Sequence, residues 1–158
     1  MRLLLQKVSQ ASVSVDDQEV ASIGSGYVLF LGVMEGDTEG QAEWLAQKVA
    51  KLRLWESPGG PPDPHGIVRA GKINDRSLLD LGGSALVVSQ FTLAGNAEQG
   101  NRPDYTAAAR PEVAKPLYER FIALLRSAGV QNVSHGSFGA MMQVSLVNDG
   151  PVTLMMER

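Results

Sequence analysis

Two apolar runs lie far apart in this chain, and each stops at a cluster of polar residues. Residues 85–88 lead into Ser-Gln-Phe-Thr at 89–92, and residues 144–147 lead into Asn-Asp-Gly-Pro at 148–151. Short apolar runs bounded by polar residues are typical of buried β-strands. A strand end on a rigid scaffold presents backbone N–H and C=O groups to a ligand. The sequence therefore predicts a sheet whose strand ends carry the binding site.

The length of 158 residues predicts a single domain, 1–158, with a substantial core. The net charge of −3 argues against a protein that coats nucleic acid, but allows contact with one end of an RNA at a few points. The absence of cysteine excludes disulfides, thiolate catalysis and zinc–thiolate sites. Without a signal peptide or a run near the ~20 apolar residues of a membrane helix, we expect a cytoplasmic protein that does not contact membranes.

The residue pattern predicts strands at both ends of the chain and two main helices between them, a mixed α+β organisation. One helix is expected to follow Thr38, which has Gln41 at the capping-box spacing, and the other to begin at Pro111 and stop at Gly129. Asp104 is a candidate cap for a short helical turn. The strand-like segments are residues 3–8, 11–15, 19–23, 27–33, 77–79, 85–91, 142–146 and 152–156. Residues 57–66, with four prolines and three glycines, are predicted to form an exposed loop.

Familiar catalytic and cofactor patterns are missing from the sequence. His65 lies in the Pro/Gly-rich loop and His135 near a turn, and neither has a second histidine or a carboxylate at metal-ligand spacing. The glycines at 24 and 26 are too close together for a dinucleotide fingerprint and predict a hairpin turn. We therefore expect neither a metal nor a cofactor.

The segment 89–92 admits two interpretations. A strand that ends in Gln90, Phe91 and Thr92 offers backbone N–H groups together with amide and hydroxyl side chains, which suits an oxyanion site for an acyl carbonyl. Thr92 is also a candidate nucleophile, although the sequence shows no base to activate it. The alternative is an ordinary strand terminus at which Thr92 caps its own backbone.

The pair Gly150 and Pro151 also admits two interpretations. One interpretation is a tight turn between two strands. The other requires a cis peptide bond, found at about 5–6% of X-Pro bonds, so that neighbouring carbonyls point the same way and hold an ammonium group. Arg102 and Pro103 lie in a polar loop that either contacts a phosphate or is simply solvated.

Along nearly its whole length the sequence resembles the D-aminoacyl-tRNA deacylase family. The matching strings are residues 6–13, 31–33 and 36–38 and, most distinctively, 87–93 and 142–153. Two such long strings in the same order make the resemblance highly specific. It implies a mixed, mainly antiparallel sheet curled into a barrel-like core with two main helices outside, and a homodimer.

The resemblance implies an editing hydrolase whose partner is aminoacyl-tRNA. Such an enzyme cleaves the ester between a D-amino acid and the terminal adenosine, and also clears glycine from mischarged tRNA-Ala. Gly150 and Pro151, joined by a cis bond, would reach into the partner subunit and bind the substrate's α-ammonium through backbone carbonyls. An L side chain would collide with this clamp, whereas achiral glycine would not.

The resemblance also distributes the other roles. The implied catalytic residues are Gln90, Phe91 and Thr92, and the implied substrate-binding residues are Ser89, Phe138, Met142, Gly150 and Pro151. Backbone N–H groups around Phe91 and Thr92 would steady the oxyanion, and Phe138 would pack on the terminal adenine. The family's threonine has been viewed as a nucleophile. Because no base for it is visible, we favour attack by water assisted by the 2′-hydroxyl of the tRNA.

The sequence departs from the family pattern in three places. Residues 57–69 are longer than usual, which would alter contacts with the tRNA stem. Asp104 replaces a common serine, and Met141 replaces a common aspartate, which affects local capping and the edge of the pocket.

Two rival functions remain open. A non-catalytic nucleic-acid-associated module on the same fold would have no reason to keep the Gly-Pro pair. An L-aminoacyl editing domain of similar fold would normally be attached to a synthetase, which we do not expect here.

Overall fold

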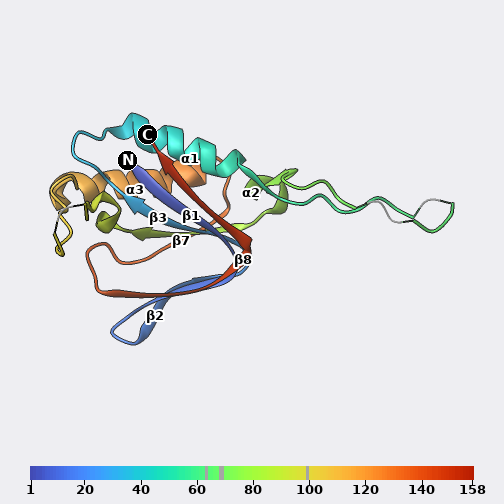
Figure 1. The fold of residues 1–158 in the computed structure, drawn as a ribbon, viewed down its shortest axis with the longest axis horizontal. Helices are drawn as coiled ribbons and strands as arrows, with labels where there is room; N and C mark the ends of the chain where they lie inside the picture. Colours follow the sequence, from blue (N-terminus) through green and yellow to red (C-terminus); the bar gives the residue numbers. More distant parts are fainter. Residues whose placement is uncertain (63, 68–69, 99) are drawn as a thin grey trace.

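A mixed six-stranded sheet curls around the core, and two helices cover one of its faces (Figure 1). The computed structural model describes residues 1–62, 64–67, 70–98 and 100–158. The strands of the main sheet are β1 (Arg2–Val15), β2 (Gln18–Ile23), β3 (Gly26–Gly32), β6 (Ser84–Ser89), β7 (Asn132–His135) and β8 (Met142–Glu157). The main helices are α1 (Glu39–Lys51) and α3 (Pro111–Ser127). The expected α+β fold with a barrel-like sheet and two main outer helices is confirmed.

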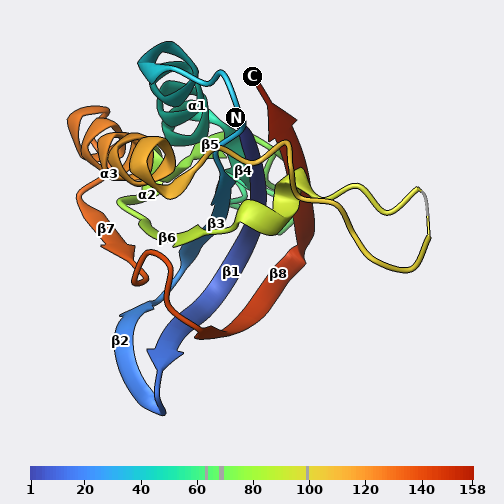
Figure 2. The same cartoon turned by 90° about the vertical axis from the view of Figure 1, so that its left-hand side faces the viewer.

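The long strand β1 organises the sheet. β8 runs antiparallel along one edge of β1, from Arg2↔Glu157 to Val15↔Met142. On the other edge, β3 pairs with the first half of β1 and β2 with the second half. β3, β6 and β7 then follow as parallel neighbours. Figure 2 shows how this arrangement turns β8 and β2 away from the plane of the other strands.

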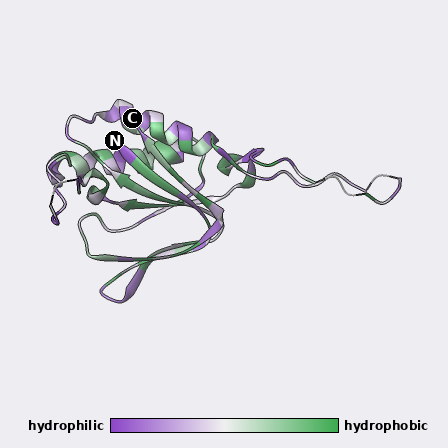
Figure 3. Cartoon of the chain, viewed as in Figure 1, coloured by the Kyte–Doolittle hydropathy of each residue, from purple (hydrophilic) through white to green (hydrophobic). Residues whose placement is uncertain are grey.

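Apolar residues fill both faces of the sheet. Leu5, Leu29 and Phe121 are fully buried in the cluster between the sheet and the helices. Val13 and Leu86 belong to a second cluster inside the curl, against which the side chains of β8 pack. β1 changes from the first cluster to the second where its pairing with β8 is interrupted by bulges, and bulges of this kind bend a strand. Figure 3 shows the strands beneath the helices as mostly hydrophobic.

The predicted helix boundaries are confirmed. Thr38 caps α1: its side chain accepts a hydrogen bond from the N–H of Gly40, and Gln41 Oε1 accepts one from the N–H of Thr38 at 3.0 Å. Pro111 is the first residue of α3, and Gly129, with φ of +103°, follows its end. Among the described residues, no helix is both long and apolar enough to cross a membrane.

Local side-chain hydrogen bonds overturn two of the predictions. The predicted strand 77–79 is wrong beyond Ser77, because Ser77 and Asp80 make a reciprocal capping box that starts the short helix α2 (Leu78–Leu81). Asp104 does not cap a helical turn. Its carboxylate instead accepts hydrogen bonds from the backbone and the hydroxyl of Thr106 in a non-helical turn.

The strand limits near both sequence motifs also differ from prediction. Segments 3–8 and 11–15 join into β1, and segments 142–146 and 152–156 join into β8. Because β8 stays paired with β1 on both sides of Gly150 and Pro151, the interpretation of that pair as a tight turn between two strands is wrong. β6 ends at Ser89 and not at Phe91, which begins the 3-10 helix η1 (Phe91–Ala94).

A two-stranded ribbon that the sequence did not predict carries the Pro/Gly-rich segment away from the body of the protein (Figure 1). It consists of β4 (Arg53–Trp55) and β5 (Arg76–Ser77). The ribbon continues beyond the strands, with the N–H of Ser57 donating to the carbonyl of Lys72 at 3.0 Å. Within the longer-than-usual segment 57–69, residues 63, 68 and 69 lie outside the described residues.

Candidate active site

The parallel strands β3, β6 and β7 end at the same edge of the sheet, and a cavity of about 710 Å³ lies there. This volume falls in the range of small-molecule sites, and the carboxyl ends of parallel strands are a common place for them. The first turns of α3 and the segment after β7 complete the wall. Six of the eight predicted site residues line this cavity: Ser89, Gln90, Phe91, Thr92, Phe138 and Met142.

The end of β6 leaves two backbone donors beside the cavity. The N–H of Gln90 donates to the carbonyl of Leu31 at 2.8 Å, which is the last contact of this edge with β3. The chain then turns into η1, whose first N–H groups have no acceptor within the helix. In the described part of the chain, the N–H groups of Phe91 and Thr92 donate no hydrogen bond. Two such donors suit the oxygen of an acyl carbonyl as it gains negative charge.

The position of η1 depends on Gly32 and Arg2, which sequence reasoning did not identify. A Cβ atom on Gly32 would lie 2.9 Å from the carbonyl oxygen of Gln90 and 3.1 Å from Cβ of Leu93. Only a glycine therefore lets η1 pack directly on the end of β3. On the other side, the Arg2 guanidinium donates to the carbonyl of Leu93 at 2.9 Å and pairs with Glu157 at 3.2 Å.

The wall of the cavity carries no charged side chain and no histidine among the described residues. The amide of Gln90 donates to Oγ1 of Thr92, and no base contacts this hydroxyl in the described part of the chain. Tyr118 donates to the carbonyl of Val87 at 2.9 Å, and burial raises the pKa of this phenol well above its usual value, so it stays protonated. Polar chemistry in the cavity therefore depends on backbone groups, neutral side chains and groups that a substrate brings.

Aromatic and thioether side chains surround the mouth of the cavity. Phe91 is 60% exposed and makes an edge contact with Tyr105, with ring centroids 5.3 Å apart. Phe138 is half-buried and packs at a tilt against Tyr118 at 5.6 Å. Met141, one of the departures from the family pattern, is 91% exposed. Flat apolar surfaces of this kind favour the face of a nucleobase.

Gly150 and Pro151 do not line the cavity of their own chain. They are exposed on a bulge of β8, because Gln6 pairs with Thr153 and Val8 with Asn148, so that four residues of β8 stand opposite Lys7 alone. The peptide bond between them is cis. The structure thus places the residues of the first motif, 89–92, around one cavity and leaves Gly150 and Pro151 of the second motif outside it.

Contacts with β1 hold this bulge. The side-chain amide of Asn148 donates to the carbonyls of Lys7 at 3.1 Å and Val152 at 3.0 Å, which closes the base of the bulge. The ammonium of Lys7 lies 3.2 Å from the carboxylate of Asp149 and 5.7 Å from the ring centroid of Trp55. Sequence reasoning missed Lys7, because the residues it contacts lie far away in the chain.

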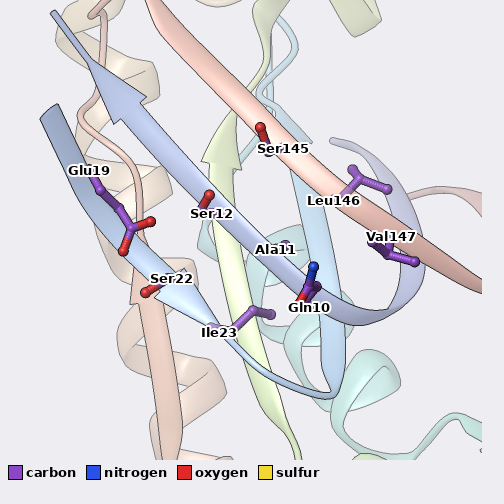
Figure 4. A pocket seen from close by; sticks show the side chains of 9 residues that line it. All are labelled: Gln10, Ala11, Ser12, Glu19, Ser22, Ile23, Ser145, Leu146 and Val147. Atoms are coloured by element: carbon purple, nitrogen blue, oxygen red, sulfur yellow. The ribbon is translucent and has the colours of Figure 1, made fainter. Parts of the chain in front are cut away.

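Two further cavities lie outside the gathered site. One, of about 370 Å³, crosses the outer face of β2, β1 and β8, and Figure 4 shows the hydroxyls of Ser12 and Ser145 on neighbouring strands within it. The other, of about 350 Å³, lies between α3 and the segment that follows β7, and includes His135. Among the described residues, no three His, Asp or Glu side chains gather as ligands for a metal ion.

Together, the curled mixed sheet, the cavity without a charged side chain among its described residues and the two backbone donors beside aromatic side chains define the class of protein: an α+β protein with an uncharged small-molecule cavity at the strand ends. The sequence model of the D-Tyr-tRNA(Tyr) deacylase family matches residues 4–157. The chain belongs to this family.

Individual proteins are similar to the chain in sequence or in fold. The chain is 53% identical to the D-aminoacyl-tRNA deacylase of Thermomicrobium roseum over 157 residues, covering 99% of this chain and 94% of the relative. The solved structure of a c-Myc DNA Unwinding Element Binding Protein is similar with a TM-score of 0.85 and 35% identity, covering 100% of this chain and 99% of the other. A probable eukaryotic D-amino acid tRNA deacylase shares the fold, with a TM-score of 0.79 and 19% identity, covering 98% and 97%.

Proposed function

We propose that the chain is a D-aminoacyl-tRNA deacylase, which hydrolyses the ester between a D-amino acid and the 3′-terminal adenosine of tRNA. The observation that carries this proposal is the pair of N–H groups at Phe91 and Thr92. They donate no hydrogen bond in the described part of the chain, and both residues line a cavity whose described wall carries no charged side chain. Such a site stabilises the tetrahedral intermediate of acyl transfer and supplies no metal-like or acid–base group of its own. Membership of the family supplies the class of substrate. A tRNA substrate also favours a cytoplasmic location.

Water is the proposed nucleophile. Its oxygen adds to the ester carbonyl, and the resulting oxyanion accepts hydrogen bonds from the N–H groups of Phe91 and Thr92. The C–O bond to the ribose 3′-oxygen then breaks, and that oxygen takes a proton as the free amino acid leaves. The neighbouring 2′-hydroxyl assists the proton transfers, because the hydroxyl of Thr92 already accepts a hydrogen bond from Gln90 and contacts no base among the residues that the structure describes.

The terminal adenosine is assigned to the aromatic part of the cavity. Phe138 and Met142 offer apolar surface to the adenine, and Ser89 lines the same wall at the end of β6. The cavity of about 710 Å³ has room for the nucleoside together with an esterified amino acid.

Gly150 and Pro151 are proposed to act in the cavity of a partner subunit. Their exposure on the bulge of β8 and their absence from their own cavity support this role. Their backbone carbonyls would hold the α-ammonium of the substrate, so that an L side chain collides while a D side chain points away. Glycine has no side chain to exclude, so glycyl-tRNA mischarged on tRNA-Ala is also a proposed substrate.

The geometry of β8 favours a two-fold homodimer that exchanges these residues. Met142 lines the cavity, and Gly150 lies eight residues further along the same strand, on the bulge between Asn148 and Thr153. If two copies of β8 lie antiparallel about an axis near Leu146, each Gly150 meets the mouth of the partner's cavity. Leu146 lines the groove of Figure 4, and the outer edge of β8 has no strand neighbour among the described residues.

The deciding experiment compares D-tyrosyl-tRNA, L-tyrosyl-tRNA and glycyl-tRNA-Ala under single-turnover conditions. We expect hydrolysis of the D and glycyl esters to exceed that of the L ester by a factor of about 100 or more. Equal rates for the D and L esters would contradict the clamp and favour an L-aminoacyl editing function. Pro151→Ala should reduce the discrimination between D and L.

A non-catalytic nucleic-acid-associated module is the second candidate. It is favoured by the similarity to the solved DNA unwinding element binding protein. The net charge of −3 disfavours broad contact with a duplex. Tight binding of duplex DNA at physiological salt, with no hydrolysis of any aminoacyl-tRNA, would establish this alternative in place of the deacylase.

A further inference from the structure

The groove between α3 and the segment after β7 has the chemistry of a site for RNA phosphates. It has a volume of about 350 Å³. Among the described residues that line it are three basic side chains, Lys115, Arg126 and His135, and one carboxylate, Glu119. None of these residues lines the active-site cavity. Three basic side chains around one concave surface stand out in a chain whose net charge is −3.

The groove and the active-site cavity share a wall. Tyr118 and Phe138 line both, and their rings pack against each other with centroids 5.6 Å apart. A strand whose terminal base packed on Phe138 in the cavity would therefore have this groove on the other side of the shared wall. Single-stranded nucleic acids are generally bound by aromatic platforms next to a basic groove.

The basic side chains are available to a ligand. Lys115 is 59% exposed and lies 4.0 Å from Glu119, an exposed pair that is weak in water. The guanidinium of Arg126 donates one hydrogen bond to the carbonyl of Val133 at 3.0 Å, which holds the head group beside β7, and a guanidinium has five N–H donors in all. His135 is exposed, with Nδ1 2.9 Å from the carbonyl oxygen of Gly136, so Nε2 is directed away from the backbone.

We propose that this groove binds the phosphates of the nucleotides that precede the terminal adenosine in the single-stranded 3′ end of tRNA. The inference rests on the proposed function, because it assumes that the adenosine occupies the active-site cavity. Phosphate contacts position a strand without reading its sequence. The groove would thus hold the common end of any tRNA and leave chirality to the cavity.

The test uses two substrates that share the esterified adenosine and differ in whether the rest of the tRNA, with its phosphates, is attached. One is D-tyrosyl-tRNA, and the other is adenosine carrying D-tyrosine on its 3′-oxygen, which has no phosphate at all. The variants are Lys115→Ala and the double variant Lys115→Ala/His135→Ala. Lys48→Ala, on the exposed face of α1, is the matched control.

We expect Lys115→Ala to lower kcat/KM on the tRNA about 5-fold and the double variant about 20-fold, mainly through KM. The groove variants should hydrolyse the adenosine ester with the kcat/KM of the wild type. The Lys48→Ala control should have wild-type kcat/KM on both substrates. The binding constant for an oligoribonucleotide that ends in CCA and carries no amino acid falls with salt concentration. The slope of its logarithm against the logarithm of the salt concentration should become shallower by about 0.7 for each phosphate contact removed. Equal losses of kcat/KM on both substrates, or an unchanged salt slope in the variants, would overturn the proposal that the groove binds phosphates.

The binding measurement separates this inference from the proposed function. If the wild type cleaves neither ester but the groove variants still weaken RNA binding, then the deacylase proposal fails and the groove stands. If the wild type cleaves both esters and the variants bind RNA normally, the groove alone fails.

Discussion

The ammonium of Lys7 lies 3.2 Å from the carboxylate of Asp149, and this ion pair joins the middle of β1 to the bulge that carries Gly150 and Pro151. Lys7 is only 12% exposed, whereas Asp149 is 50% exposed. The ammonium also packs over Trp55, whose ring stacks on Tyr27 at 4.7 Å. The bulge is thus anchored to the buried core and not only to its own strand.

Lys7→Met should clearly reduce the discrimination between D- and L-aminoacyl-tRNA and should have little effect on the free energy of unfolding. The variant keeps the apolar contact with Trp55 and removes the charge that holds Asp149. Because Asp149 is half exposed, we expect the free energy of unfolding in urea to change by about 1 kcal/mol or less. The ratio of kcat/KM for D- and L-tyrosyl-tRNA should fall about 10-fold. Asp149→Asn should behave alike, and an unchanged ratio in both variants would show that the ion pair does not position the bulge.

Thr92→Ala should leave substantial activity. The hydroxyl of Thr92 accepts a hydrogen bond from Gln90 and, within the described ranges, contacts no base, so its loss should lower kcat by about 10-fold or less. Single-turnover hydrolysis of D-tyrosyl-tRNA measures this directly. A loss beyond about 1,000-fold, together with a trapped acyl-enzyme in the wild type, would instead identify Thr92 as a covalent nucleophile.

Gly32→Ala should impair the site by moving η1. The added Cβ meets backbone at 2.9 Å and the Cβ of Leu93 at 3.1 Å, neither of which is a flexible side-chain end. Overpacking of this kind typically costs about 1–3 kcal/mol, which thermal unfolding will detect. We expect kcat to fall by a larger factor than KM changes. Gly24→Ala is the control, since nothing lies within 4 Å of its Cβ position. Equal effects of the two substitutions would argue against the close packing of η1 on β3.

Asp80→Asn should remove part of the acid dependence of stability. Hydrogen bonds from the Ser77 hydroxyl and backbone lower the pKa of Asp80 below its usual value of 3.8. A carboxyl with a lowered pKa in the folded state stabilises the protein above its unfolded pKa, and this contribution disappears as the pH falls through the folded value. The melting temperatures of wild type and variant should therefore differ at pH 6 and converge below pH 3. A constant difference across that range would contradict the role of the ionised carboxylate.

Val147→Asp should weaken the proposed homodimer. Val147 is 49% exposed on β8, next to Leu146, where the proposed two-fold axis would pass. Two copies of a new carboxylate facing each other across the axis would repel. Light scattering after size exclusion should show a shift towards monomer and a parallel loss of deacylation. Thr153→Asp, on an exposed position beyond the bulge, should leave the mass unchanged. A wild-type monomer with full activity would refute the exchange of Gly150 and Pro151.

Residue patterns predicted the parts of the fold that depend on local structure. The capping box at Thr38, the start of α3 at Pro111 and the gathering of residues 89–92 at a strand end all followed from short-range signals. The capping box of α2 carried the same signal, since Asp80 lies three residues after Ser77, but the neighbouring leucines were interpreted as a strand. Pairing with β1 decided the nature of the Gly150–Pro151 segment, and no local pattern reports such pairing.

The contacts that organise the site cross large distances in the chain. Arg2 donates a hydrogen bond to Leu93, and Lys7 forms an ion pair with Asp149. Neither contact is indicated by a periodicity or a motif in the sequence. The groove beside α3 is similar, because Lys115 and His135 come together only when α3 lies next to β7. Sequence reasoning therefore identified the residues with unusual backbone roles and missed the residues that position them.

The unused donors at Phe91 and Thr92 belong to the main chain, and this affects how the protein is probed and how it changes. Scanning by side-chain replacement leaves both N–H groups in place, so such a scan will understate the importance of the segment. Replacing the amide by an ester at either position through semisynthesis would remove one donor and preserve the side chain. In the proposed mechanism, side chains around the cavity can therefore be replaced without loss of the chemistry, as long as the turn keeps its shape.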